Sequence, residues 1–308
     1  MQVFSIIVLV LLLLLLVALG VYLIVMRVFF HKVFGRKNIK HRLEEKSGLI
    51  DTYKIDLCWF DANKFQTLKI ISYDDLKLEA HFLENEGDKI AILVHGYGCD
   101  YREMSSFAKM FFKMGHSVLL VQNRGHGKSE GNIGMGFFDS KDILLWVNVL
   151  TEKNPKCKIV LFGLSMGGAA VCMSLKEELP KNVVCAISDC AFENVFKELS
   201  MVYNPKHKKL KQFLFNSFAN YMKRAYGFDL NAADCGISLK KSQIPVMIIH
   251  GKSDSFVPVE NAYNLYEKLP KFRGDIYIVD DAEHAMSYAK NPYRYEVRVR
   301  EFLKKWGM

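Results

Sequence analysis

The stretch KIVLFGLSMGG, residues 158–168, decides the fold class predicted for this chain of 308 residues. Residues 159–162 are apolar, which is typical of a strand buried on both faces of a sheet, and a helical run follows the glycines. Ser165 lies between Gly163 and Gly167. A sharp strand-to-helix turn needs glycine there, since larger side chains would clash where the serine stands clear of the sheet. The stretch therefore predicts a strand, a strained turn that presents a serine nucleophile, and a helix whose N-terminus favours developing negative charge.

Short apolar strands and helical stretches alternate on both sides of this turn. The expected strands are residues 89–94, 117–122, 158–162, 183–187, 245–249 and 276–279, after a hairpin of residues 69–72 and 76–83. The expected helices are residues 103–114, 139–150, 166–179, 260–269 and 293–306. This alternation predicts an α/β fold with a mostly parallel central sheet and helices on both faces. Residues 192–241 do not follow this alternation of strands and helices, and we interpret them as a helical cap insertion over the site.

Two downstream residues are candidates to activate the serine hydroxyl, which is a weak nucleophile without a base. Asp254 follows one expected strand in the motif HGKSD, and His284 follows the next in DAEH. We predict His284 as the general base and Asp254 as the acid that orients its imidazole, in the chain order Ser, Asp, His. Asp189, Asp280 and Asp281 compete with Asp254 for this role. The plain structural alternative is a turn residue for Asp254 and a polar helix start for His284.

The motif HGYG at residues 95–98 follows the strand 89–94 and is the candidate for part of an oxyanion site. Acyl transfer needs two backbone donors aimed at the charge that develops on the carbonyl oxygen. We predict the backbone N–H groups of Tyr97 and Met166 as these donors. The alternative is that residues 95–98 form a plain β-to-α connection.

Together these motifs resemble the α/β-hydrolase superfamily, most closely its branch of serine aminopeptidases and monoglyceride lipases, and membrane-anchored bacterial hydrolases of unassigned substrate. The resemblance covers roughly residues 69–308 and rests on HGYG, on NRGHGKSEG at residues 123–131, on GLSMGG, on HGKSD and on His284. It implies the α/β-hydrolase fold and a serine triad. Relatives often have Asp at the position of Asn123, and His126 of the same motif is expected to be structural.

The N-terminus predicts a membrane anchor. Residues 1–26 carry no charge, and from Val3 to Met26 they are almost wholly Val, Ile and Leu. A hydrocarbon core about 30 Å thick needs about 20 helical residues, so one transmembrane helix fits. A cleaved signal peptide is the alternative, because Ala18-Leu19-Gly20 resembles a cleavage site, but no basic region precedes the apolar run.

The residues after this helix predict its orientation. Residues 27–60 form a basic juxtamembrane segment before a hydrolase domain at residues 61–308, and its charges within 27–46 are Arg27, Lys32, Arg36, Lys37, Lys40, Arg42 and Lys46 against Glu44 and Glu45. By the positive-inside rule, the catalytic domain should face the cytoplasm of a single-pass protein in the cell membrane. A second basic excess in residues 191–241 favours anionic lipid headgroups over nucleic acid as a partner.

No cofactor or metal is predicted. The histidines at residues 95, 116, 126 and 250 lack the paired spacing of a zinc site, and the seven cysteines lack metal-type spacing. There is no phosphate loop, and the glycines at residues 131, 134 and 136 lack the preceding strand of a dinucleotide motif. Nothing in the sequence indicates an oligomeric state.

The predicted function is a serine hydrolase that cleaves carboxylic esters through an acyl-enzyme intermediate. The basic, aromatic cap next to the anchor favours amphiphilic, lipid-like acyl esters taken from the membrane surface. A serine peptidase or an acyltransferase with the same triad is one alternative. A membrane-tethered binding module that keeps the fold without turnover is an alternative of another class.

Overall fold

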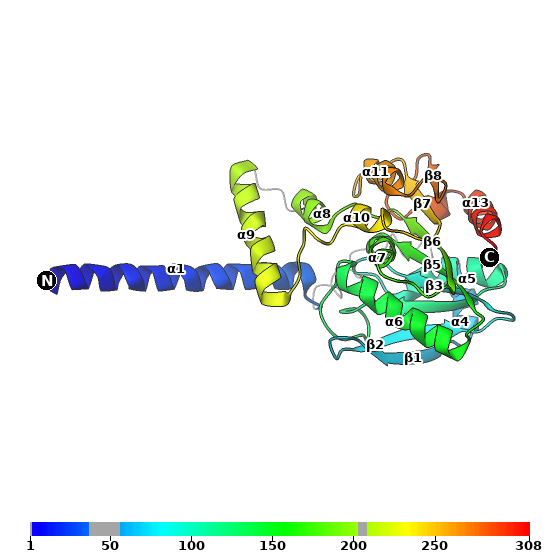
Figure 1. Ribbon diagram of the computed structural model, residues 1–308, viewed down its shortest axis with the longest axis horizontal. Helices are drawn as coiled ribbons and strands as arrows, with labels where there is room; N and C mark the ends of the chain where they lie inside the picture. The colour runs from blue at the N-terminus through cyan, green and yellow to red at the C-terminus, as the bar shows by residue number, and fades with distance from the viewer. Residues whose placement is uncertain (1, 37–55, 203–207) are drawn as a thin grey trace.

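Eight strands form one sheet in the computed structural model, which describes residues 2–36, 56–202 and 208–308 (Figure 1). In chain order they are β1 (Gln66–Ile71), β2 (Lys77–Leu83), β3 (Lys89–Val94), β4 (Ser117–Gln122), β5 (Lys158–Leu164), β6 (Val183–Asp189), β7 (Val246–Gly251) and β8 (Gly274–Val279). Their spatial order is β1-β2-β4-β3-β5-β6-β7-β8. Strand β2 pairs antiparallel with β1 and β4, and the remaining pairs are parallel. The predicted α/β fold with a mostly parallel sheet is confirmed.

Helices cover both faces of this sheet. One face carries α6 (Phe137–Lys153), α7 (Met166–Ser174), α10 (Cys235–Leu239) and α11 (Glu260–Lys268), and the other carries α4 (Leu57–Ala62), α5 (Ser105–Lys113) with the short helix η2 (Tyr101–Met104), α12 (Ser287–Lys290) and α13 (Pro292–Lys305). Alternate residues of the central strands enter the two cores: Ile92 and Val94 of β3 pack on the α6 side, and Leu93 packs on the α5 side. The sheet is therefore buried on both faces, as continuous apolar strands require.

Two details differ from the predicted helices. Helix α7 ends at Ser174, five residues before the expected end, because the Ser174 hydroxyl bonds back to the Val171 carbonyl and the chain then turns toward Pro180. The short helices α4 and α12 were not predicted, since each is too brief to show a helical period in the sequence.

The cap region contains α8 (Val195–Val202) and α9 (Lys208–Tyr226), followed by α10. Helix α9 lies across the end of α1 (Gln2–Phe34), and α8 leads from β6 toward it (Figure 1). Phe215, Phe218 and Met222 form the buried side of α9. The predicted cap is thus helical, and it joins the same core that lies under α6 and α7.

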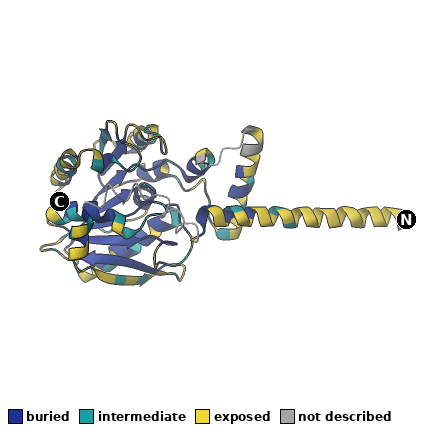
Figure 2. Ribbon diagram, turned by 180° about the vertical axis from the view of Figure 1, so that it is seen from behind, coloured by how far each residue is buried: buried dark blue, intermediate teal, exposed yellow. Residues whose placement is uncertain are grey.

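Helix α1 is longer than predicted and ends inside the domain. Its residues are exposed from Val3 to Leu19, whereas Met26, Phe30, Val33 and Phe34 are buried in the domain core (Figure 2). Helix α1 thus continues beyond the anchor expected at residues 1–26, and the first part of the segment expected at residues 27–60 is the packed end of α1. The basic residues Lys37, Lys40, Arg42, Lys46 and Lys206, with Glu44 and Glu45, lie outside the described residues.

Candidate active site

The serine turn has the strained geometry that its glycines predict. Ser165 has φ 56° and ψ −117°, an unusual conformation for a residue with a side chain, and α7 begins at the next residue. A Cβ atom on Gly163 would lie 2.2 Å from the Gly167 carbonyl oxygen, and one on Gly167 would lie 2.0 Å from the Val94 carbonyl oxygen. Only glycine fits at either position, so the side chain of Ser165 is held at the end of β5.

Three side chains from three different turns form one chain of hydrogen bonds at this point. Ser165 Oγ lies 2.9 Å from His284 Nε2, and His284 Nδ1 lies 2.6 Å from Asp254 Oδ2. An ionised carboxylate only accepts hydrogen bonds, so Nδ1 carries the imidazole proton and Nε2 is left to accept from the serine hydroxyl. The arrangement can move a proton from Ser165 to His284.

The turns that carry Asp254 and His284 are joined through their backbones. The backbone N–H of Ser253 donates to the Ala282 carbonyl at 3.0 Å, and that of Lys252 donates to the Val279 carbonyl at 2.9 Å. A Cβ atom on Gly251 would lie 2.3 Å from the Ala282 oxygen, so glycine is required for the two turns to approach. The glycine of HGKSD thus sets the distance between the acid and the histidine.

Asp254 is buried but remains a strong acid. Burial raises its pKa, but hydrogen bonds from His250 and His284, and from the backbone N–H of Val257, outweigh burial and hold the pKa below its usual range. Asp254 Oδ1 also accepts from the backbone N–H of Phe256 at 3.0 Å. The carboxylate is therefore fixed and charged, as an orienting acid must be.

Of the competing acids, Asp189 and Asp280 have other hydrogen-bond partners than His284. Asp189 is buried beside Ser287 and Tyr295, which donate to it at 3.2 and 2.8 Å, and burial raises its pKa. Asp280 pairs with Lys252 at 2.9 Å, and Asp281 is an exposed turn residue with φ 55°. Among the residues considered for the acid, Asp254 alone has a hydrogen bond to His284 in the described part of the chain.

The HGYG turn lies directly against the serine. A Cβ atom on Gly96 would be 3.4 Å from both the Leu164 carbonyl oxygen and Ser165 Cβ. Met166 is the first residue of α7, on the other side of Ser165. The predicted oxyanion donors, the N–H groups of Tyr97 and Met166, thus belong to the two segments that flank the serine.

Two buried histidines, neither assigned a site role by the sequence, hold the HGYG turn in place. His126 Nε2 accepts a 3.0 Å hydrogen bond from the backbone N–H of Gly98, and His95 Nε2 accepts one of 3.1 Å from that of Asn123. Burial, and then the nearby His95, lower the pKa of His126 to about 3, so its ring is neutral at physiological pH. The Asn123 side chain, where relatives often have Asp, donates to the His95 carbonyl at 2.8 Å.

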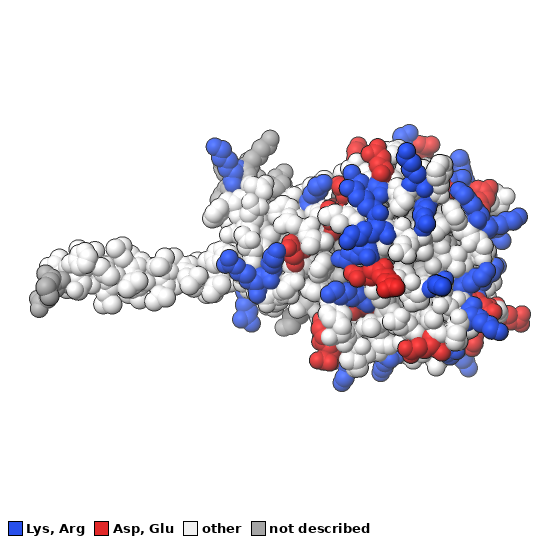
Figure 3. Space-filling view, viewed as in Figure 1, with Lys and Arg blue, Asp and Glu red and all other residues white. Residues whose placement is uncertain are grey.

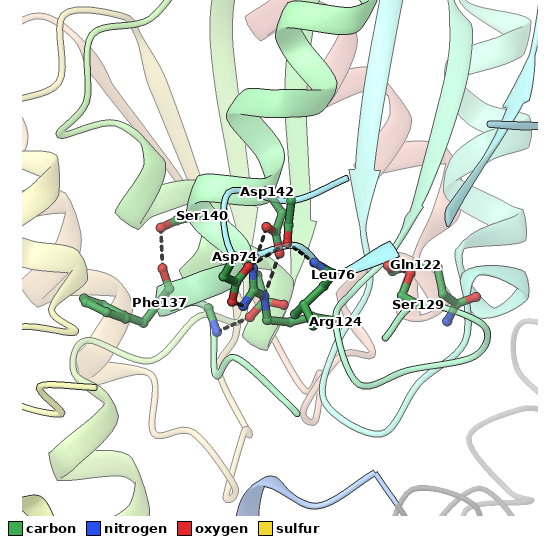
Figure 4. A network of polar contacts seen from close by, with 11 residues as sticks. Asp74, Leu76, Gln122, Arg124, Ser129, Phe137, Ser140 and Asp142 are labelled. Atoms are coloured by element: carbon green, nitrogen blue, oxygen red, sulfur yellow. Dashed lines mark hydrogen bonds and ion pairs between the residues drawn. The ribbon is translucent and has the colours of Figure 1, made fainter. Parts of the chain in front are cut away.

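A buried ion pair fixes the turn that carries His126. Arg124 is 3% exposed, and its guanidinium donates to Asp142 of α6 at 2.7 Å and to Asp74 of the β1–β2 turn at 2.9 Å (Figure 4). Bidentate pairing with a carboxylate gives the guanidinium a fixed orientation. Arg124 therefore ties the RGHGKS turn to two other elements behind the site.

Glu198 of α8 is a further buried acid, near enough to Asp254 to be affected by its charge, and no motif pointed to it. Its side chain is 6% exposed, and its Oε1 atom has no hydrogen-bond partner. Burial, followed by the charge of Asp254, raises the pKa of Glu198 to about 7. In the described residues, no three His, Cys, Asp or Glu side chains form a group that could hold a metal ion.

The chain is similar to several known proteins. Residues 85–223 match the family model described as serine aminopeptidase, S33. The chain is 25% identical to the uncharacterized protein YqkD of Bacillus subtilis over 93% of this chain and 92% of that protein. It is 25% identical to an uncharacterized membrane protein of Saccharomyces cerevisiae over 79% and 81% of the two chains.

A solved structure has a similar fold. An esterase of Pyrococcus furiosus superposes with a TM-score of 0.64 at 25% identity, covering 80% of this chain and 93% of that one. The mostly parallel sheet, the strand-turn-helix around Ser165 and these likenesses lead to one conclusion. The chain is a member of the α/β-hydrolase superfamily.

Proposed function

We propose that the protein is a serine hydrolase that cleaves carboxylic esters, with Ser165 as nucleophile, His284 as general base and Asp254 as the orienting acid. The observation that carries the proposal is the chain of hydrogen bonds at 2.9 and 2.6 Å that joins these three side chains. The likeness to a solved esterase supports an ester as the scissile bond.

The reaction would proceed in two acyl-transfer steps. Ser165 Oγ attacks the ester carbonyl carbon while its proton passes to His284 Nε2, and the resulting imidazolium gives that proton to the departing alcohol. The acyl group is then bound to Ser165, and a water molecule, deprotonated by His284, releases it as a carboxylic acid. Asp254 keeps the imidazole in one tautomer and stabilises its charged form.

The N–H groups of Tyr97 and Met166 would bind the oxyanion in both steps. Removal of one preorganised oxyanion donor costs about 3–4 kcal/mol of transition-state stabilisation in sites of this kind. The support for this assignment is the contact of Gly96 with Ser165 and the start of α7 immediately after the serine.

The test is labelling of the full-length chain, purified in detergent, with a fluorophosphonate that reacts only with an activated serine. Wild type should be labelled, and Ser165→Ala and His284→Ala should not, while all three keep the same thermal unfolding midpoint. Ser287→Ala, which alters a buried serine outside the hydrogen-bonded chain, is the matched control and should still be labelled. An unlabelled but folded wild type would favour the alternative of a non-catalytic binding module.

A second candidate is an aminopeptidase-like activity, which the match to the S33 family model favours together with Glu198. The buried Glu198 carboxylate has an oxygen atom with no partner, and such a group could accept a hydrogen bond from a protonated substrate amine. Rates on short acyl esters and on aminoacyl anilides would separate the two candidates. Transfer of the acyl group to an added alcohol would show the acyltransferase alternative.

We further propose that α1 anchors the enzyme in the cell membrane with its catalytic domain in the cytoplasm. Among the described helices, the Val3–Phe34 segment is long and apolar enough to cross a membrane. Arg27, Lys32 and Arg36 at its C-terminal end support the cytoplasmic side for the domain. Digestion of the domain by protease added to intact cells would contradict this orientation.

A further inference from the structure

Helix α9 lies at the depth on α1 where a bilayer surface is expected. The apolar part of α1 that precedes Tyr22, from Val3 to Val21, spans about 28 Å at about 1.5 Å per residue, and Leu23, Ile24 and Val25 after Tyr22 are also exposed. This length is close to the thickness of a hydrocarbon core, about 30 Å. Tyr22 donates a 3.3 Å hydrogen bond to the Ser217 carbonyl of α9. The domain therefore begins where the bilayer would end.

The direction of α9 suits the plane of a membrane. Figure 1 shows α9 running across α1 and extending to one side of it, and aromatic contacts fix the crossing. Phe29 packs edge-on against Phe215 and Phe218, with ring centroids 6.2 and 4.5 Å apart, and Phe30 stacks on Tyr226 at 3.9 Å. If α1 crosses the bilayer, then α9 lies along its surface.

The exposed surface of α9 is divided into two unlike halves. At 3.6 residues per turn, one half carries Lys209, Gln212, Asn216, Asn220 and Lys223, which we name the polar half. The other, which we name the outer half, carries Phe213, Leu214, Ser217, Tyr221 and Ala225, with Arg224 near its C-terminal end. Phe213 is 68% and Leu214 is 40% exposed, although both are large apolar side chains. The Tyr22 contact is made to Ser217, so the outer half is the one beside the apolar part of α1.

Basic residues border this surface. Arg27 at the end of the apolar run and Lys209 on the polar half are exposed, and the exposed Arg224 lies in the outer half near the C-terminal end of α9. Figure 3 shows Lys and Arg side chains where α9 meets α1, whereas α1 before that point carries no charge. An amphipathic helix with apolar residues on one side and cations at its edge is typical of a segment that lies in the headgroup region.

We propose that α9 is an in-plane membrane helix, whose outer half rests in the headgroup region of the bilayer that α1 spans. This rests on the proposed anchoring by α1. The bilayer is a better occupant than a second copy of the chain, because the outer half continues directly from the lipid-facing surface of α1. Helix α9 would thus hold the cap against the membrane from which an amphiphilic ester enters.

The test places single tryptophans in the full-length chain, reconstituted in phosphatidylcholine–phosphatidylglycerol vesicles with or without brominated acyl chains. Phe213→Trp reports on the outer half, and Gln212→Trp, one residue away on the polar half, is its matched control. Leu12→Trp reports separately on whether α1 lies in the bilayer. The emission of the native Trp59, Trp146 and Trp306 is subtracted by means of the parent chain.

If α9 lies in the interface, brominated lipid removes most of the emission added by Phe213→Trp, its spectrum shifts to the blue, and Gln212→Trp is little changed. Quenching of Leu12→Trp without quenching of Phe213→Trp overturns the proposal but keeps the anchor. No quenching of either overturns the anchor as well. A blue-shifted but unquenched Phe213→Trp, in chains that a chemical crosslinker joins in pairs, also overturns the proposal. The outer half would then pack against a second copy of the chain. Equal unfolding midpoints in detergent verify that the variants are folded.

Discussion

The phenolic hydroxyl of Tyr97 donates a 2.6 Å hydrogen bond to the backbone carbonyl oxygen of Val33. Tyr97 belongs to the turn that lies against Ser165, and Val33 belongs to the last turn of α1. A second hydrogen bond, from the backbone N–H of Ile133 to the Phe34 carbonyl, joins the same helix end to the loop before α6. The end of the apolar helix is therefore part of the framework that holds the proposed oxyanion turn.

Replacement of Tyr97 by Phe should remove this hydrogen bond and little else. We expect a loss of about 1 kcal/mol in the free energy of unfolding, the usual net value of one buried hydrogen bond. We also expect a several-fold fall in kcat for ester hydrolysis, because the turn beside Ser165 loses a support. Tyr263→Phe, at a half-exposed position on α11, is the control and should change neither. Unchanged stability and kcat in Tyr97→Phe would show that the contact with α1 is dispensable.

The packing of the α1 end should be visible in stability. Phe34 is 1% exposed and contacts Phe218 of the cap and Phe228. Phe34→Ala should destabilise the full-length protein by about 3–5 kcal/mol, the usual loss for a buried Phe. Val28→Ala, on the exposed side of the same helix, should change stability by less than about 0.5 kcal/mol. Chemical unfolding in detergent measures both, and equal effects would mean that α1 is only a tether.

Substitution of two aspartates distinguishes the orienting acid from its rival. Asp254→Asn should lower kcat by about 10⁴-fold, as loss of the orienting carboxylate does in other triads, without unfolding the protein. Asp189→Asn should keep most of the activity, since Asp189 bonds to Ser287 and Tyr295 rather than to His284. Steady-state hydrolysis of a short acyl ester by both variants is the measurement. A comparable loss of kcat in Asp189→Asn would contradict the assignment of the orienting role to Asp254 alone.

The buried pair of Arg124 should matter for folding more than for chemistry. Arg124→Met would leave the Asp142 carboxylate buried without its cation, which typically lowers the free energy of unfolding by about 3–5 kcal/mol. The double variant Arg124→Met, Asp142→Leu removes both charges and should recover a large part of that loss. Thermal unfolding of the two variants tests this. Equal midpoints for them would contradict the pairing.

The sequence could predict the parallel strands because each is a continuous apolar run between polar segments. Strands β3 and β4 begin and end at the predicted residues, and the antiparallel β1–β2 pair was also expected. The turn at Ser165 could be recognised because its motif has glycines at positions where larger side chains would clash. Such features depend on a few neighbouring residues.

The long-range contacts could not be predicted in this way. The bond from Gly98 to His126 joins two loops, and no periodic pattern relates them. Glu198 looked like an ordinary helical charge, because its burial depends on how the cap packs. The end of α1 did carry a signal: Met26, Phe29, Phe30, Val33 and Phe34 follow the helical spacing of a buried face. The charges between them concealed it.

Glu198 gives a prediction for pH dependence. Burial, and then the charge of Asp254, raise its pKa to about 7 in the folded protein, against 4.5 for an ordinary glutamate. The folded state therefore binds more protons than the unfolded state between these values, and stability must fall as pH rises. The contribution is fully present below pH 4.5 and is lost as pH rises through about 7.

The variant Glu198→Gln isolates this effect, because the amide cannot ionise. Its stability relative to wild type should increase from pH 4.5 to above pH 7, by at most about 3 kcal/mol for a shift of this size. Chemical unfolding at closely spaced pH values measures the difference. Glu178→Gln, at an exposed position, should run parallel to wild type throughout. A constant difference between Glu198→Gln and wild type across this range would mean that Glu198 is ionised in the folded protein and already paired.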